Sequence, residues 1–290
     1  MKDIALLVGN GVNTISKGIT WEKLLNNIID FCKCNDLSKD KNKPFPLFYE
    51  EIFLNAIAHK SIKNEDVLKN YIAEQVLSIP PNEIHELIRE VRPVHIMTTN
   101  YEFLLEGRKP KQNDGLVQEV KFSVFRKFNI DGLVYWHIHG DCNNPATINL
   151  GYEHYSGQLQ KMRNYVTSGT DYKSKNVLTV SLARRLKNID DKFVIQSWID
   201  LFFIKDIHII GLTLGFAETD LWWLLTYRAR IVQYDQSFEV KNRIFFYIPS
   251  EYYSVDDFRI KLLKATGVEV VPINIKHGVE YYKHIINIIL

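Results

Sequence analysis

Three polar clusters in this chain each follow a short apolar stretch. One cluster holds two glycines and two asparagines, one holds an asparagine after two threonines, and one holds two histidines and an aspartate. Their members are Gly9, Asn10, Gly11 and Asn13; Thr98, Thr99 and Asn100; and His137, His139 and Asp141. Buried parallel strands are short and apolar, and open α/β sheets bind ligands beyond the carboxyl ends of their strands. We therefore expect the three clusters to line one shared crevice.

The glycine cluster follows the apolar residues 5–8 and precedes an amphipathic stretch. Closely spaced glycines at such a turn let backbone N–H groups approach a pyrophosphate. Gly9 and Gly11 permit a tight turn, while Asn10 and Asn13 add donors and acceptors beside phosphates or ribose. The alternative is a plain strand-to-helix turn that binds nothing.

Asn100 stands at the end of the second apolar stretch. A carboxamide there can hold a ribose hydroxyl and a water molecule together, because it offers a donor and an acceptor without a charge that repels phosphate. The alternative is an N-cap for a helix that begins at Tyr101, since asparagine is favoured at that position.

The two histidines lie two residues apart on a predicted strand, so their side chains point to the same face. One interpretation makes His137, His139 and Asp141 a metal site. The favoured interpretation makes one histidine a general base and the other structural, because imidazole titrates near neutral pH. His139 is the better candidate for the base because it stands at the strand end, directly before Gly140. A nucleophilic pair of Cys142 with His139 is a further alternative.

Apolar periodicity predicts an alternation of strands and helices. We expect strands at residues 3–8, 94–98, 133–136, 207–211, 243–248 and 268–271, with a further β-rich stretch at 116–120 and a turn at 129–132. We expect helices at residues 21–34 with Thr20 as N-cap, within 46–91 with a break at 79–81, within 152–201, and at 218–230, 255–264 and 279–290. At the start of the helix at 218–230, Glu218 or Asp220 is expected to cap the N-terminus, the alternative being a hydrogen bond to a ribose.

This order predicts an α/β fold with a Rossmann-like, mostly parallel sheet and helices on both faces. The chain is expected to form a single domain over residues 1–290. A helical insertion would occupy residues 35–91, and a second helical segment residues 152–201.

Composition narrows the classes of partner. The formal net charge is +2 and 46% of the residues are hydrophobic, so we expect neither direct binding of nucleic acid nor a membrane partner. The three cysteines include no Cys-x-x-Cys pair, which disfavours a disulfide framework and a four-cysteine zinc site. We expect a cytoplasmic protein without a metal ion.

The clusters also resemble the motifs of the sirtuin (SIR2) superfamily, and most closely its bacterial SIR2-like branch. Sirtuins carry Gly-Ala-Gly-x-Ser followed by Gly-Ile-Pro-Asp-Phe-Arg, then Thr-Gln-Asn-x-Asp, then a His-Gly pair with the catalytic base. The counterparts here are GNGVN at 9–13, GITWE at 18–22, TTNYE at 98–102 and HG at 139–140. IIGLTLG at 209–215 is similar to the strand and Gly-Thr-Ser loop that hold the adenosine of NAD.

The resemblance implies a role for each matching residue. Asn100 would position the nicotinamide ribose and the attacking water, and His139 would be the base. NAD+ would be bound by Gly9, Asn10, Gly11, Asn13, Thr99, Gly211 and Thr213. Two departures count against protein deacylation: the zinc ribbon of four cysteines is missing, and no arginine follows Gly18 and Ile19 at the matching position.

The function implied by the resemblance is an NAD+ hydrolase (NADase) that yields nicotinamide and ADP-ribose. Bacterial SIR2-like domains of this kind often act as NAD-depleting effectors in anti-phage defence by abortive infection. A partner protein or a homo-oligomer would then control the activity. The alternatives are a catalytically silent module that binds NAD or ADP-ribose, and a sirtuin-type deacylase or ADP-ribosyltransferase.

Overall fold

The computed structural model describes residues 2–16, 21–38, 40, 43–174, 176–189, 193–235 and 238–290. At its centre lies a seven-stranded sheet in the order β3-β4-β2-β1-β5-β6-β7. The strands are β1 (Lys2–Val8), β2 (Pro93–Thr98), β3 (Phe128–Ile130), β4 (Leu133–His137), β5 (Asp206–Ile210), β6 (Ile244–Pro249) and β7 (Glu269–Ile273). Neighbouring strands are parallel except in the β3–β4 hairpin. The predicted Rossmann-like α/β fold is confirmed.

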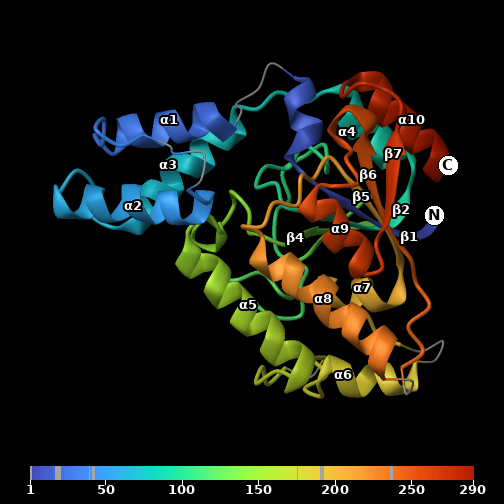
Figure 1. Cartoon of the computed structure of the whole chain (residues 1–290). Helices are drawn as coiled ribbons and strands as arrows, with labels where there is room; N and C mark the ends of the chain where they lie inside the picture. Colours follow the sequence, from blue (N-terminus) through green and yellow to red (C-terminus); the bar gives the residue numbers. More distant parts are fainter. Residues whose placement is uncertain are drawn as a thin grey trace.

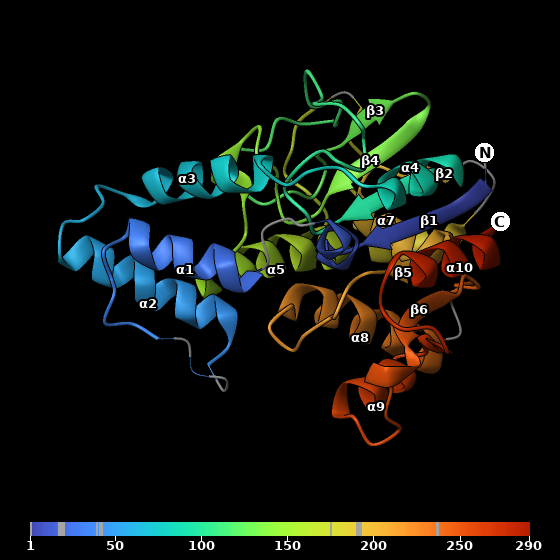
Figure 2. The same cartoon turned by 90° about the horizontal axis from the view of Figure 1, so that it is seen from above.

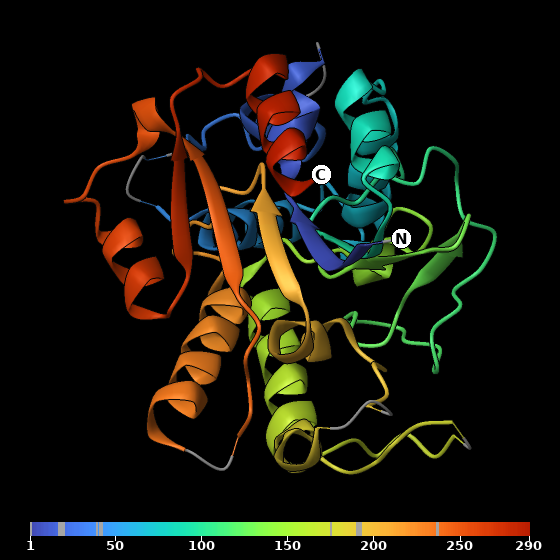
Figure 3. The same cartoon turned by 90° about the vertical axis from the view of Figure 1, so that its right-hand side faces the viewer.

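Helices cover both faces of the sheet, with α4 and α10 on one side and α7 and α8 on the other (Figures 1 and 3). The α-helices are α1 (Trp21–Phe31), α2 (Phe45–Ala58), α3 (Glu65–Leu77), α4 (Glu83–Glu90), α5 (Tyr152–Thr167), α6 (Leu182–Arg185), α7 (Trp198–Ile204), α8 (Thr219–Tyr234), α9 (Phe258–Ala265) and α10 (Val279–Ile289). None of these described helices is both long and apolar enough to cross a membrane.

Two hydrophobic cores result, one on each face of the sheet. In β1, Leu6 and Val8 join the core shared with α4 and α10, while Ala5 and Leu7 join the core shared with α7 and α8. All four side chains are fully buried. A strand covered on both faces has no polar side, which explains why its sequence is continuously apolar.

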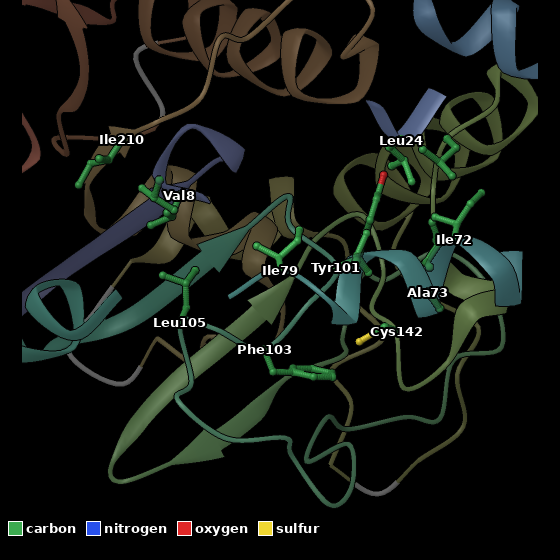
Figure 4. Packing of buried hydrophobic residues seen from close by; sticks show 14 of the residues in the cluster. Val8, Leu24, Ile72, Ala73, Ile79, Tyr101, Phe103, Leu105, Cys142 and Ile210 are labelled. Atoms are coloured by element: carbon green, nitrogen blue, oxygen red, sulfur yellow. The ribbon is translucent and has the colours of Figure 1, made fainter. Parts of the chain in front are cut away.

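Helices α1, α2 and α3 form a lobe beside the sheet, here called the helical lobe. In Figure 2 the arrow of β1 points towards it, so the lobe stands beyond the carboxyl ends of the strands. It is anchored by contacts of α3 with the 3-10 helix η2 (Pro145–Thr147) and of α2 with α5. Figure 4 shows the core continuing from Val8 at a strand end, past Tyr101, to Leu24 and Ile72 of the lobe.

Several predicted boundaries need correction. Helix α1 ends at Phe31 rather than at residue 34, and Lys33 then takes a left-handed φ of 54°. Helix α9 begins at Phe258 rather than at residue 255, because the Asp257 carboxylate caps it by accepting from Arg259 N at 2.7 Å. In the second helical segment, the described residues 168–174 and 176–181 contain no helix. The predicted N-cap Thr20 lies outside the described residues.

The predicted β-rich stretch at residues 116–120 is wrong. These residues are irregular, and the charged Glu119 is buried while the apolar Val120 beside it is exposed. Its Oε2 accepts from the backbone N–H groups of Val124, Phe125 and Arg126 at 2.9–3.0 Å. The loop therefore folds around a buried carboxylate, and the strand that pairs antiparallel with β4 is β3. Asp131 and Gly132, both with positive φ, make the hairpin turn within the predicted turn at 129–132.

Candidate functional site

The predicted polar clusters lie side by side, because β4, β2, β1 and β5 are consecutive in the sheet and parallel. Hydrogen bonds join the strand ends directly. Thr98 Oγ1 donates to Val8 O at 2.9 Å, Ile138 N donates to Thr98 O at 2.9 Å, and Gly9 N donates to Ile210 O at 2.9 Å. The structure thus brings the glycine cluster, Asn100, His139 and Gly211 to one edge of the sheet.

The glycines of the first cluster are required by contact between two loops. A Cβ atom on Gly9 would lie 2.6 Å from Gly211 O, and one on Gly11 would lie 2.7 Å from the same oxygen. Gly11 N donates to Gly211 O at 2.8 Å, and Gly9 N is engaged by Ile210, so neither N–H group is free in this structure. Gly211 itself has a φ of 64°. In this structure the glycines permit close packing of the β1 and β5 loops, and a direct contact with a nucleotide stays a prediction.

Asn13 is the centre of a saturated hydrogen-bond network. Its Nδ2 donates to Asn10 Oδ1 and to Glu102 Oε1, both at 2.9 Å. Because His85 Nδ1 accepts from Asn82 N at 3.0 Å, His85 Nε2 carries the hydrogen that it donates to Asn13 Oδ1 at 2.8 Å. Burial and nearby Arg89 lower the pKa of His85 to about 4, which keeps the ring neutral. Asn13 therefore orients Asn10 and Glu102.

Asn100 shows the opposite pattern. Its backbone is fixed, since its N–H donates to Thr98 Oγ1 at 3.0 Å and its carbonyl accepts from His137 Nδ1 at 2.8 Å. Its side chain is only 4% exposed, yet neither Oδ1 nor Nδ2 has a hydrogen-bond partner among the described residues. A buried carboxamide without partners destabilises a fold by about 1–3 kcal/mol per group, so such a group calls for an explanation. A ligand that bonds both atoms would provide one. Thr99, beside it, is also buried.

His137 is structural. Its Nδ1 donates to Asn100 O, and its Nε2 lies 2.8 Å from Glu106 Oε1. Burial alone would lower the pKa of His137, but the Glu106 carboxylate more than offsets this and raises it to about 9. A protonated ring donates from both nitrogens, and it holds Asn100 in place.

His139 has the properties of a general base held by a carboxylate. It is 2% exposed, and its Nε2 lies 2.9 Å from Oδ2 of the fully buried Asp220. Burial lowers the pKa of His139, but the Asp220 charge and hydrogen bond outweigh it and the net shift is upward. With Nε2–H directed at Asp220, the neutral ring has its lone pair on Nδ1. The Tyr155 ring packs edge-on against the imidazole at 5.3 Å.

The acids at the start of α8 do not cap it as predicted. Glu218 occupies the N-cap position without a capping hydrogen bond from its side chain, and Asp220 bonds His139 instead. Burial raises the pKa of Glu218 to about 7. The charge of His139 lowers this pKa and the charge of Asp220 raises it. Thr213, predicted to bind adenosine, is exposed, and its carbonyl accepts from Arg259 Nη1 at 2.7 Å.

The structure assembles neither of the two alternatives for the histidine cluster, the metal site and the nucleophilic pair of Cys142 with His139. Both nitrogens of His137 are engaged, and Asp141 Oδ2 pairs with the buried Arg126 Nη1 at 3.1 Å. No group of three or more metal-ligating side chains is found within the described ranges. Burial and the charge of Asp141 raise the pKa of the Cys142 thiol to about 12, and the thiol shows no bond to His139 in the described part of the chain. Cys142 therefore has neither the thiolate nor the partner that a nucleophile needs.

Sequence reasoning placed Asn100 and His139 at neighbouring strand ends but missed the residues that hold them. Asp220 lies 81 positions from its partner His139, and Glu106 lies 31 positions from His137. The available signal was an acid in the segment that follows β5, at the start of α8, which was interpreted as a cap. In GITWE at 18–22, the counterpart of the second sirtuin motif, Gly18, Ile19 and Thr20 lie outside the described residues.

A comparison with models of protein families finds a match in the region of the site. A family model described as a SIR2-like domain matches residues 94–188, the segment that contains both Asn100 and His139. SIR2-like domains use NAD+. No curated protein matches the chain at a significant level.

Proposed function

Taking the chain as a member of the SIR2-like superfamily, we propose that it hydrolyses NAD+ at the bond between nicotinamide and ribose. The products are nicotinamide, ADP-ribose and one proton. The observation that carries the proposal is the carboxamide of Asn100, which is buried, fixed through its backbone and without a partner at either atom. A ribose hydroxyl and a water molecule offer the donor and the acceptor that it lacks.

Each step of the chemistry has a residue in this proposal. Asn100 holds the ribose and the water so that the water oxygen faces C1′ of the ribose. As the bond from C1′ to nicotinamide breaks with its electron pair on the leaving nitrogen, the water oxygen bonds C1′ and gives a proton to Nδ1 of His139. Asp220 fixes the ring orientation and stabilises the imidazolium that forms, as the carboxylate of a catalytic triad does.

The rest of the nucleotide would extend over the loops after β1 and β5. Asn10, which Asn13 orients, and Thr99 stand on the side of Asn100, while Gly211 and Thr213 stand on the side proposed for adenosine. Gly9, Gly11 and Asn13 would shape this surface, since their polar groups are already engaged within the protein.

The biological role proposed here is that of an NAD-depleting effector in bacterial anti-phage defence. Support comes from the resemblance to the bacterial SIR2-like branch, in which such effectors are held inactive until triggered. A partner protein or a second copy of the chain would then control the activity.

The unpartnered carboxamide of Asn100 also favours a second candidate, a module that binds NAD+ or ADP-ribose without turnover. Chromatography of nicotinamide and ADP-ribose separates the two, after incubation of the protein with NAD+ at pH 6–9, both alone and together with the proteins encoded by its neighbouring genes. For a hydrolase we expect equimolar products, lost in Asn100→Ala and His139→Ala and retained in the matched control Asn129→Ala, at an exposed position of β3. NAD+ bound but intact at every pH would favour the silent module.

A further inference from the structure

Asn149 lies between the two proposed catalytic elements. It follows η2 and precedes α5, and its backbone forms hydrogen bonds with His139 and Tyr101. Asn149 N donates to His139 O at 2.9 Å, and Tyr101 Oη donates to Asn149 O at 2.7 Å. One residue is thus attached to the base and to the residue that follows Asn100.

The two backbone hydrogen bonds of Asn149 do not involve its side chain. It is 2% exposed, and its Nδ2 is buried without a hydrogen-bond partner among the described residues. Asn100 has the same combination of a clamped backbone and an unpartnered amide. The neighbouring buried Asn13 differs, because both of its amide atoms are bonded. Unpaired amides therefore occur next to the proposed reaction site.

The carboxamide is not needed to shape its own segment. Gly140, with a φ of 89°, lets the chain pack so closely that a Cβ atom there would lie 2.1 Å from Thr147 O. That contact and the two backbone hydrogen bonds of Asn149 hold the segment beside His139. A buried N–H₂ group that neither supports the backbone nor meets a protein acceptor is suited to an acceptor on a ligand.

We propose that Asn149 is a third substrate-contacting residue, whose Nδ2 donates to a hydroxyl oxygen of the nicotinamide ribose. This inference rests on the proposed function. The ribose is the chemical class indicated, because the segment is bonded to His139, beside which the ribose carbon must lie for water to attack it. An uncharged donor suits a hydroxyl oxygen, which has lone pairs and no charge to neutralise.

Calorimetry of NAD+ binding tests the proposal, in the His139→Ala background so that turnover does not interfere. Adding Asn149→Ala should raise the Kd about three- to tenfold, the loss of one hydrogen bond between uncharged groups. The increase should vanish for an NAD+ analogue that lacks the contacted ribose hydroxyl, with the 2′-deoxy and 3′-deoxy forms tested separately. Asn129→Ala is the matched control and should leave the Kd unchanged.

Thermal unfolding without NAD+ separates this role from a structural one. Asn149→Leu keeps a similar volume and removes the unpaired amide, so its melting temperature should equal or exceed that of the parent protein while NAD+ affinity falls. An unchanged Kd in both Asn149 variants, with Asn100→Ala still weakening NAD+ binding, would overturn the inference alone. If the parent protein does not bind NAD+ at all, the proposed function itself fails.

Discussion

The buried pair of His137 and Glu106 makes the stability of the protein depend on pH. Both side chains are inaccessible to solvent, and His137 also holds the carbonyl of Asn100. The informative change is Glu106→Gln. Glutamine keeps the size of the side chain and an oxygen for Nε2–H, but removes the charge that raises the pKa of His137.

The size of the effect follows from the two pKa values of His137. The pKa rises from 6.5 in the unfolded chain to about 9 in the folded protein, so the folded state binds the proton more tightly. The resulting stabilisation is full below pH 6.5 and is lost as the pH rises through 9. A shift of this size corresponds to on the order of 3 kcal/mol. In Glu106→Gln burial dominates, and this stabilisation should be absent.

Urea unfolding of the two proteins between pH 6 and pH 10 measures the effect. We expect the difference in free energy of unfolding, wild type minus Glu106→Gln, to fall across this range by on the order of 3 kcal/mol. His139 and Glu218 titrate in both proteins, so most of their contribution cancels in the difference. A difference that stays constant with pH would refute the assignment of His137 as a buried cation.

Two further predictions concern the base and the glycine loop. Asp220→Asn removes the charge that raises the pKa of His139, so the acid limb of the pH profile of NAD+ hydrolysis should move to lower pH while kcat falls by about 10²-fold or more; an acid limb that stays in place would contradict the pairing. Gly9→Ala places a Cβ atom 2.6 Å from Gly211 O and should destabilise the protein by about 1–3 kcal/mol in urea unfolding. Gly215→Ala, which meets no atom within 4 Å, is the control and should change stability by less than about 0.5 kcal/mol. Equal effects of the two glycine substitutions would argue against the close loop packing.

The sheet could be predicted because its signals are local. A strand such as β1 is buried on both faces and therefore apolar throughout, and it ends where polar residues and glycine begin. The wrong prediction of a β-rich stretch at residues 116–120 also rested on a local signal. Alternation along the chain does not reveal that Glu119 turns inward. The amides that satisfy Glu119 come from residues 124–126, and that contact exists only in three dimensions.

The site was predictable only in part. The positions of Asn100 and His139 could be predicted because each stands at a strand end, which the apolar pattern of the chain reveals. Asp220 and Asn149 could not, because their roles depend on the elements that fold against His139. Gly9 was expected to face a phosphate, whereas its close neighbour is the backbone of Gly211, a contact that spacing along the chain does not show.

The central claim is that the strand-end site around Asn100 cleaves NAD+. The most direct measurement is quantitative chromatography of nicotinamide and ADP-ribose formed from NAD+ by the wild-type protein, by Asn100→Ala and by Asn129→Ala, at equal protein concentrations, both alone and together with the proteins encoded by neighbouring genes. The account predicts equimolar products from the wild type and from Asn129→Ala, and none above background from Asn100→Ala. Equal product formation by Asn100→Ala and the wild type, or NAD+ that the wild type binds and leaves intact, would contradict it.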